Sequence, residues 1–393
     1  MNDARAPRRS AAAIHALTHL GRTPVREFLA RHWQRRPLLI RQALPGFEAP
    51  FSARTLLDLS VRDEVESRLL ERAGGRWRLR HGPFRPGAMP SPRRAGWTLL
   101  LQGVDLHLDS AAELIARFRF IPDARLDDLM VSYASDGGGV GPHVDSYDVF
   151  LLQALGKRRW RIERRPDPSC VPGLPIRQLA RFRPQAEWVL EPGDLLYLPP
   201  GVAHDGVAIG ESITCSIGFR TPSWTDLAGA WSETQSAAAV RTAFRDPGLL
   251  PSPHPARLPD RMIEQAQRQL LRRRPGRREV ALALLQQLSG PKPRVTFEPP
   301  VRPMSRARFA EAIRRRGLRT DRRTRMLYSN ETLAVNGELV PLPEPPQRAL
   351  MRSLADRRVL AFGPGAQRGQ PRPDPVLTLL YEWYVAGWVH PGA

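Results

Sequence analysis

The chain of 393 residues is too long for one ordinary domain, so its length predicts two or three domains. It has no apolar run of the roughly 18–20 residues that span a bilayer, no apolar secretory segment, and only two cysteines. We therefore expect a cytoplasmic protein that neither crosses a membrane nor depends on disulfides. The net charge is +21, but all 60 basic residues except Lys157 and Lys292 are arginines. Because such a bias often reflects a GC-rich genome, the charge alone does not indicate a nucleic-acid partner.

The charge is distributed unevenly. Residues 101–150 hold nine acidic and three basic side chains, although the chain as a whole is strongly basic. An acidic wall would attract a cationic substrate. Solvated acidic loops explain the same count equally well, so both interpretations stay open.

The first elements are a tail and a helix. Residues 1–19 are basic and Ala-rich, and we expect a flexible tail there. A helix is predicted over residues 20–45, with Pro24 at its start and apolar residues at helical spacing, namely Val25, Phe28, Leu29 and Trp33. The sequence RPLLIR over residues 36–41 predicts a short strand.

Between about residues 97 and 220 the pattern changes to short apolar runs separated by Gly and Pro. Such a series predicts a β-sandwich or barrel, interrupted by a helical insert at Ala111–Phe120. The predicted strands are Trp97–Gln102, Asp128–Tyr133, Asp148–Gln153, Arg158–Ile162, Trp188–Leu190, Asp194–Leu198 and Ser212–Phe219.

After residue 222 the sequence becomes rich in Ala, Gln, Arg and Leu. Helices are predicted over 224–245 and 260–289, joined by a Pro-rich segment at 247–259. Pro291-Lys292-Pro293 predicts a second boundary. The remaining residues predict a winged-helix-like domain, with a hairpin at Asn336-Gly337 and helices near 305–316, 345–356 and 375–388. The expected domains are 20–222, 223–290 and 291–393.

The most informative pattern is the His-x-Asp of His143 and Asp145. On a strand, residues two apart point to the same side, so the two side chains can bind one metal ion. A third ligand is His204, which follows two tight turns in EPGDLLYLPPGVAH (191–204). Two His and one carboxylate form the facial triad of non-haem Fe(II) oxygenases. A lone His-x-Asp is commonly a surface coincidence, but this longer combination favours a metal site.

Arg158 is the candidate anchor for an anionic cosubstrate. If KRRWRI (157–162) is a strand, Arg158 shares the inward face with Trp160 and Ile162. A buried guanidinium must be paired, either with a cosubstrate carboxylate or with an internal Asp or Glu. The sequence leaves both partners open.

Residues 20–220 resemble the JmjC/cupin-like oxygenases, and within them the bacterial ribosomal oxygenases that hydroxylate an arginine of large-subunit ribosomal protein sixteen. The resemblance is carried by Trp33–Arg41, Asp127–Tyr133, Gly137–Trp160, Glu191–His204 and Ser216–Arg220. It implies an α+β fold with a double-stranded β-helix as catalytic domain. A helical dimerisation domain and a winged-helix-like domain would follow it.

The resemblance also implies the roles of the site residues. His143, Asp145 and His204 would bind Fe(II), and Arg158 would bind 2-oxoglutarate, with molecular oxygen as the third reactant. Ser132 is the expected second anchor for 2-oxoglutarate, since Ala134, two residues further on, cannot donate a hydrogen bond. Ser216 is a weaker candidate.

An arginine substrate would be held by an aromatic face and a carboxylate. Tyr147 alternates in phase with His143 and Asp145, and Asp128 or Asp136 is expected to pair with the guanidinium. Each of them is equally explained as a solvated turn residue or a packed core tyrosine.

The leading hypothesis is an Fe(II)- and 2-oxoglutarate-dependent hydroxylase of a ribosomal protein that works as a homodimer without a membrane. Nucleic-acid binding is compatible with this hypothesis but not required by it. One alternative is a JmjC histidyl hydroxylase or methyl-lysine demethylase. Another is a non-catalytic metal-binding cupin that binds RNA or protein through its basic C-terminal half.

Overall fold

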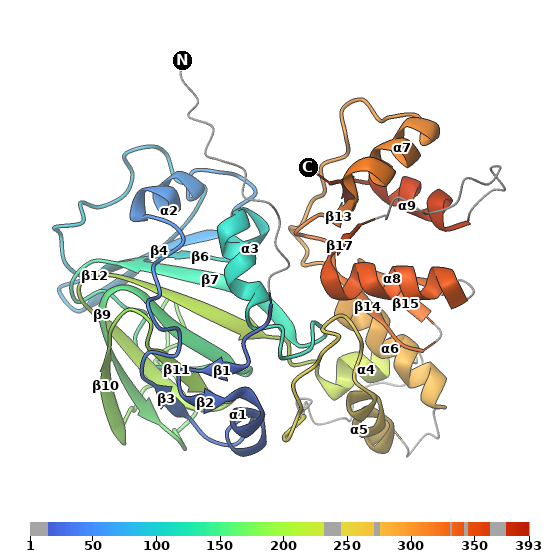
Figure 1. Cartoon of the computed structure of the whole chain (residues 1–393). Helices are drawn as coiled ribbons and strands as arrows, with labels where there is room; N and C mark the ends of the chain where they lie inside the picture. The colour runs from blue at the N-terminus through green and yellow to red at the C-terminus, as the bar shows by residue number, and fades with distance from the viewer. Residues whose placement is uncertain are drawn as a thin grey trace.

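The structure, a computed structural model, describes residues 15–231, 245–270, 276–330, 332–341, 345–361 and 375–392 (Figure 1). Most of the expected tail, residues 1–14, lies outside these ranges. Within them, a small hairpin of β1 (His19–Leu20) and β2 (Thr23–Pro24) precedes the first helix. No helix in the described ranges is long and apolar enough to cross a bilayer.

An antiparallel sheet of ten strands is the main element of the first half of the chain (Figure 1). Along the sheet the strand order is β3-β11-β9-β12-β7-β6-β4-β5, while β10 pairs with β9 and β8 pairs with β12. The bounds are β3 Leu38–Ile40, β4 Ser67–Ala73, β5 Arg76–His81, β6 Trp97–Leu101, β7 Leu126–Ala134, β8 His143–Val144, β9 Val149–Glu163, β10 Ala186–Leu190, β11 Leu195–Leu198 and β12 Ala203–Phe219.

Two long strands, β9 and β12, run through both parts of this sheet. They pair with each other along their length, with a register break between Ile209 and Ile213. At the break, Gly156 has φ +63°, and a Cβ there would lie 1.9 Å from the carbonyl oxygen of Glu211. Only glycine fits such a close approach of two backbones. The two segments predicted as separate strands, Asp148–Gln153 and Arg158–Ile162, are therefore one bent strand, because Gly156 bends β9 without ending it.

The prediction missed the hairpin of β4 and β5, whose strands are interspersed with arginines. The strands pair from Arg68 with His81 to Ala73 with Arg76. The connecting residues Gly74 and Gly75 have φ of +56° and +77°. A Gly-Gly pair of this kind is itself a hairpin signal.

The first helix is much shorter than predicted, because α1 spans only Val25–Arg31. The chain turns at Gln34, which has a positive φ of 56°. Tertiary contacts hold this turn: the Gln34 backbone N–H donates to Tyr197 Oη at 2.7 Å, and its side-chain amide donates to Asp148 Oδ2 at 2.9 Å. Long-range hydrogen bonds therefore end a helix that the apolar spacing alone would continue.

The remaining elements of the first half are helical and lie close to their predicted positions. The predicted insert is α3, Asp109–Ala116, preceded by the 3₁₀ turn η1, Val104–Leu106. Helix α2, Ala53–Leu59, was not predicted; Ser52 caps it by accepting a hydrogen bond from the Thr55 N–H.

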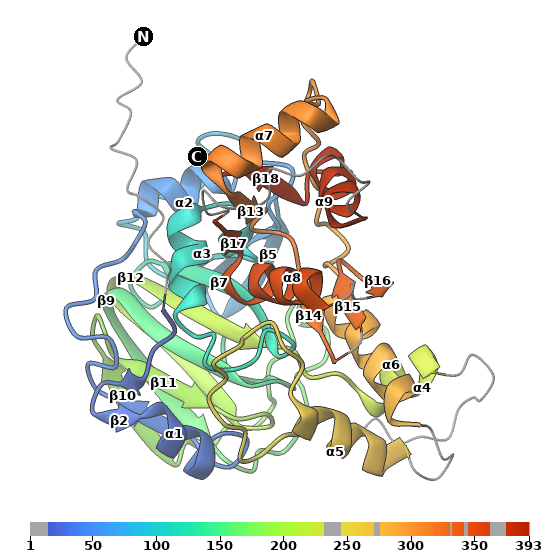
Figure 2. The same ribbon diagram turned by 45° about the vertical axis from the view of Figure 1, so that its right-hand side comes forward.

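The second half consists of helices and two three-stranded sheets, grouped on one side of the curved sheet (Figure 2). The predicted helix over 224–245 is described as far as 231, and the one over 260–289 is two helices, with 271–275 outside the described residues. The bounds are α4 Trp224–Trp231, α5 Asp260–Leu270, α6 Arg277–Ser289, α7 Arg306–Arg316, β13 Leu318–Thr320, β14 Met326–Tyr328, β15 Thr332–Val335, β16 Glu338–Pro341, α8 Pro345–Arg357, β17 Val359–Leu360, α9 Pro375–Val385 and β18 Val389–Pro391.

The predicted hairpin at Asn336-Gly337 is found between β15 and β16, with positive φ at both residues. One buried cluster joins Leu284 and Leu285 of α6 to Leu327 of β14 and Ala334 of β15. A shared core therefore crosses the predicted boundary near residue 291. The winged-helix-like architecture and the domain limits remain predictions.

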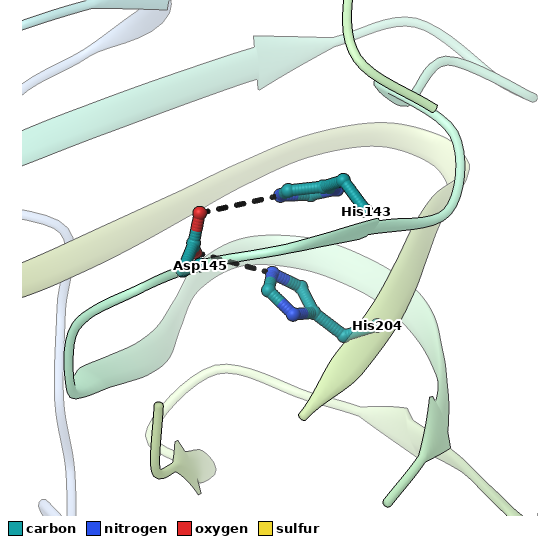
Figure 3. Close-up of side chains that lie close together, drawn as sticks. All are labelled: His143, Asp145 and His204. Atoms are coloured by element: carbon teal, nitrogen blue, oxygen red, sulfur yellow. Dashed lines mark ion pairs between the residues drawn. The ribbon is translucent and has the colours of Figure 1, made fainter. Parts of the chain in front are cut away.

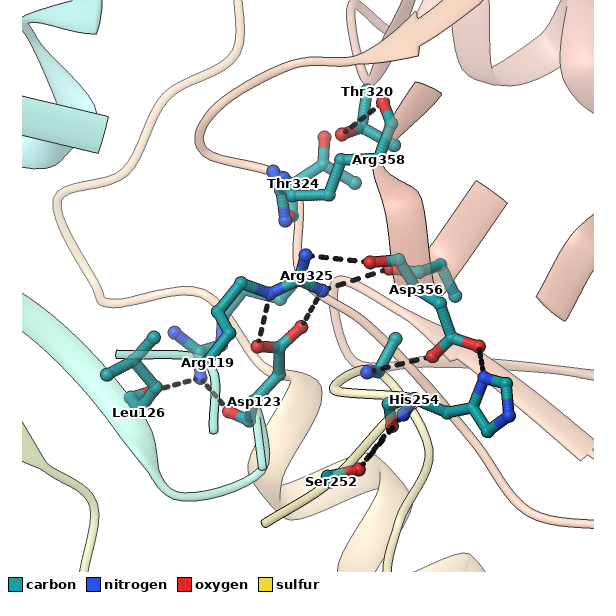
Figure 4. Close-up of polar contacts among 12 residues, drawn as sticks. Arg119, Asp123, Leu126, Ser252, His254, Thr320, Thr324, Arg325, Asp356 and Arg358 are labelled. Carbon is teal, nitrogen blue, oxygen red and sulfur yellow. Dashed lines mark hydrogen bonds and ion pairs between the residues drawn. The ribbon is translucent and has the colours of Figure 1, made fainter. Parts of the chain in front are cut away.

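Arginines bind the two halves together (Figure 4). Arg119 holds Asp123 through two hydrogen bonds of 2.9 and 2.6 Å and donates to the Asp356 carbonyl at 2.7 Å. Arg325, next to β14, donates back to the carbonyls of Asp123 and Leu126. These contacts fix the C-terminal elements against the start of β7.

A buried cluster of ionised side chains surrounds Arg125. The guanidinium contacts Asp148 at 3.2 Å and also Asp246, and all three side chains are fully buried. Trp33 donates to Asp246 at 3.1 Å, and Tyr197 donates to Asp148 at 2.6 Å. Burial raises the pKa of Asp148 to about 6, against the lowering effect of Arg125. Arg125 therefore compensates two carboxylates from distant segments.

Replacing Arg125 with Met should lower the free energy of unfolding by about 3–5 kcal/mol, because it leaves two buried carboxylates without a cation. Urea unfolding measures the change. The control is Arg31→Met, which removes an exposed i,i+4 pair with Glu27 and should cost less than about 1 kcal/mol. Equal losses in the two variants would contradict the role of the cluster.

Candidate metal centre and its cavity

Strand pairing brings the three predicted ligands together. The short strand β8 pairs with the start of β12, with His143 directly opposite His204 and Val144 opposite Ala203. Asp145 is the residue after β8, so its side chain returns to the side of His143. The two turns before His204 serve to deliver the start of β12 to this position.

The three side chains converge on one point (Figure 3). The Oδ2 atom of Asp145 lies 3.5 Å from Nε2 of His204, and Oδ1 lies 4.0 Å from Nε2 of His143. All three potential ligand atoms lie within 4.8 Å of one another. Two imidazole nitrogens and one carboxylate on one side of a point are the donor set of a facial triad, so the residues present fit a divalent metal such as Fe(II).

Backbone carbonyls fix the tautomers of both imidazoles. Nδ1 of His143 donates to the Gly141 carbonyl at 2.9 Å, and Nδ1 of His204 donates to the Val202 carbonyl at 3.2 Å. Nε2 of each ring is then left as the lone-pair donor that faces Asp145. Burial, together with the neighbouring His143, lowers the pKa of His204 to about 4. The ring is therefore neutral at pH 7, as a metal ligand must be.

A cavity of about 630 Å³ opens beside the triad. Its wall combines apolar side chains with a similar number of polar and charged ones, Arg68 and Arg177 among them. Those that bear on the chemistry are Ser132, Tyr147, Val149, Leu151, Arg158, Trp160 and Ser216. The structure thus brings Ser132, Ser216, Tyr147 and Arg158 to the metal triad, whereas Ala134 does not line the cavity.

Arg158 reaches this cavity as a buried cation that forms no ion pair with a carboxylate in the described part of the chain. Its side chain is only 4 % exposed, and Nη1 donates to Ser132 Oγ at 3.0 Å. Nε and Nη2 have no hydrogen-bond partner within the described residues. The negative charge of Asp205 raises the pKa of Arg158 somewhat, but the Asp205 carboxylate forms its ion pair with Arg161, at 2.6 Å, and not with Arg158. Burial lowers the pKa of Arg158 to about 10, which leaves it charged. The alternative of an internal ion pair is therefore wrong among the described residues.

The predicted substrate residues fall into two groups. Tyr147 and Asp128 line the cavity. Asp136 does not: the chain turns outward after β7, the side chain is exposed, and Oδ1 accepts a hydrogen bond from the Gly210 N–H at 2.8 Å. The prediction that Asp136 pairs with a bound guanidinium is thus incorrect, because the Asp136 side chain holds the Gly210 N–H at the protein surface and does not line the cavity.

Some residues near the site were missed. Lys292 lies 2.9 Å from Asp128, and Gln102 also holds Asp128, through a hydrogen bond of 2.6 Å. Lys292 was interpreted only as part of a domain boundary. Its rarity was the available signal, since it is one of two lysines in a chain that otherwise uses arginine.

Comparison with known proteins gives one family match and several relatives. Residues 113–227 match the family described as JmjC domain. The chain is 38 % identical over 232 residues to the ribosomal protein uL16 3-hydroxylase of Escherichia coli, which is 58 % of this chain and 62 % of that one. It is 35 % identical over 206 residues to a probable ribosomal oxygenase of Haemophilus influenzae, covering 51 % and 50 %. These alignments span less than two thirds of either relative.

Solved structures extend the likeness to nearly the whole chain. The X-ray structure of E. coli YcfD superposes with a TM-score of 0.77 at 28 % identity, covering 95 % of this chain and 100 % of that one. A structure of E. coli YcfD, described as a ribosomal oxygenase in complex with cobalt and 2-oxoglutarate, gives 0.74 at 28 % identity, with 95 % and 99 % covered. The resemblance to JmjC/cupin-like ribosomal oxygenases and the α+β JmjC/cupin fold are confirmed.

Removing the carboxylate of the triad should abolish tight metal binding. We expect Asp145→Ala to weaken Co(II) affinity by roughly a hundredfold or more, because outer-shell changes alone cost roughly 10–100-fold. Calorimetric titration of Co(II) into the apoprotein measures it. The control is His81→Ala, since His81 also lines the cavity but lies outside the triad. Equal affinity of Asp145→Ala and the wild type would refute the triad as the metal site.

Proposed function

We propose that this chain is an Fe(II)- and 2-oxoglutarate-dependent oxygenase that hydroxylates a side chain of a large-subunit ribosomal protein, with an arginine of uL16 as the favoured target. His143, Asp145 and His204 would hold the metal. Arg158 and Ser132 would hold the cosubstrate. The name of the E. coli relative and the complex of YcfD with cobalt and 2-oxoglutarate support the proposal.

The observation that carries the proposal is the buried Arg158 guanidinium with two unpaired donors beside the metal triad. A guanidinium at this depth requires an anion, and its planar donors suit a carboxylate. 2-Oxoglutarate is a dicarboxylate that can bind a metal at one end and Arg158 at the other. Ser132, already hydrogen-bonded to Arg158, is placed to share the distal carboxylate.

The chain's own contribution is positioning and the exclusion of water. Bound Fe(II) and 2-oxoglutarate supply the activation of molecular oxygen for insertion into a C–H bond. Buried apolar side chains line the cavity beside the metal triad, namely Val149, Leu151 and Trp160. The backbone carbonyls that hold both imidazoles keep the ligands oriented without reorganisation.

A cationic side chain fits the remaining part of the cavity. Tyr147, 39 % exposed, offers an aromatic face, and Asp128 offers a carboxylate on the wall. These two residues are proposed as the arginine subsite. A non-catalytic cupin would not need Tyr147 and Asp128 in these positions. Nor would such a function explain why Arg158 is buried with two donor groups that have no partner among the described residues.

The proposal includes a homodimer formed through residues 223–290, which the resemblance implies, and a cytoplasmic location, which the sequence predicts. Sedimentation equilibrium tests the first: a mass of about one 44.2 kDa chain at micromolar concentration would contradict it.

Arg158→Met should raise the KM for 2-oxoglutarate at least roughly tenfold, because hydrogen bonds to a charged group are lost. Co(II) affinity should stay unchanged, which separates the role of Arg158 from that of the triad. Lys157→Met is the matched control, because this neighbour forms an exposed pair with Glu191. The result that opposes the assignment is an unchanged KM in Arg158→Met.

Incubation with recombinant uL16, Fe(II) and 2-oxoglutarate should add one oxygen to an arginine, as read by tandem mass spectrometry. His143→Ala should abolish the gain. An oxygen on histidine, or the loss of a methyl group from lysine, would instead support the related JmjC activities. Absence of any 2-oxoglutarate turnover by the iron-loaded chain would favour the non-catalytic alternative.

A further inference from the structure

Asp128 belongs to the walls of two cavities that bear on the site. One is the metal cavity of about 630 Å³, and the other, of about 470 Å³, lies against the segment that contains Lys292. Asp128 and Gln102 line both of them. The carboxylate of Asp128 is therefore reached from the metal side and from the C-terminal half at the same time.

The two oxygens of this carboxylate have different surroundings. Oδ2 accepts from Gln102 Nε2 at 2.6 Å and lies 2.9 Å from Lys292 Nζ. Oδ1 takes part in no hydrogen bond with the described residues and lies beside Gly218, where a Cβ would come within 3.5 Å of it. Because Gly218 is part of the metal-cavity wall, Oδ1 is left for a donor that enters that cavity.

Lys292 is also the cation that balances Asp128. Asp127 has a second partner, Arg220, at 3.1 Å, whereas Lys292 spans Asp127 at 3.0 Å and Asp128 at 2.9 Å. Asp105, 8 % exposed, lies nearby, and burial together with Asp128 raises its pKa to about 7. Without Lys292, Gln102 would be the one side chain among the described residues that still holds the Asp128 carboxylate.

We propose that Lys292 is a positioning residue for the substrate: with Gln102 it holds Oδ2 of Asp128, so that the carboxylate presents Oδ1 to a cationic side chain in the metal cavity. The inference rests on the proposed function, because it deepens the arginine subsite. Lys292 lies well beyond residues 113–227, the JmjC match. The C-terminal half therefore completes the substrate subsite, whereas the metal triad identified among the described residues lies wholly in the first half.

The test compares four single variants of the full chain, and the double variant of Lys292→Met with Asp128→Asn, with the wild type. Lys292→Met removes the cation, Lys292→Arg restores it, and Asp128→Asn removes the carboxylate. Arg294→Met is the matched control, because Arg294 lies two residues away, is exposed, and only approaches Glu66 at 3.9 Å. The readouts are KM and kcat for uL16, uncoupled 2-oxoglutarate turnover, and the dissociation constant of N-acetylarginine methylamide by titration with the metal-loaded protein.

Lys292→Met should raise the KM and the dissociation constant at least roughly tenfold, as expected for a weakened charge-assisted contact. Uncoupled turnover should not change. Lys292→Arg should stay within about threefold of the wild type, and Arg294→Met should match it. In the Asp128→Asn background, Lys292→Met should add nothing, since Lys292 acts through Asp128.

Three results overturn the inference. One is an unchanged KM in Lys292→Met while Asp128→Asn raises it. Another is tighter binding in Lys292→Met, which would make Lys292 a competitor of the substrate. The third is an unchanged dissociation constant in Asp128→Asn. If the wild type does not modify uL16, that failure belongs to the proposed function, and the arginine-analogue titration still decides the role of Lys292.

Discussion

The pairing of β9 with β12 is the constraint on which the site depends. These two strands run side by side from the metal end of the sheet to its far end, and they bend together where Gly156 approaches Glu211. His204 lies on β12 before the bend, and Ser216 lies on the same strand after it. Arg158 and Trp160 of β9 face the same interior. His204, the anion anchor and the apolar wall are therefore held by one ladder of backbone hydrogen bonds, which positions them more rigidly than separate loops would. The strand β8, which carries His143, pairs with the start of the same β12.

The sequence predicted the parts of the site that follow from local periodicity. His143 and Asp145 are two residues apart on a strand, and Arg158 alternates with Trp160, so their common orientation can be read without a structure. The length of α1 could not be read in this way, because hydrogen bonds from Gln34 to Asp148 and Tyr197 end that helix. Asp136 looked equivalent to Asp128 in sequence, and only the outward turn after β7 distinguishes them. Lys292 was out of reach because more than 160 residues separate it from Asp128.

The arginine content has a structural use that the net charge did not suggest. Several guanidinium groups are buried at the junction of the two halves, where they donate mainly to carbonyl oxygens. Nη2 of Arg358 donates to the carbonyls of Asp321, Arg322 and Thr324. Burial lowers the pKa of Arg358 to about 10, yet the group remains charged at pH 7. With five donors in a plane, a single arginine can satisfy several turn carbonyls at once. Some of the arginines are thus structural groups inside the fold.

The core shared by α6 with β14 and β15 has a consequence for cooperativity. Separating the helical segment from the C-terminal sheets would expose Leu284, Leu285 and Leu327, each buried at about 1 % exposure or less. An opening that exposes so much apolar surface lies near the global free energy of unfolding and well above that of a hinge motion. Helix α6 and the sheet of β14 and β15 are therefore expected to unfold as one cooperative unit.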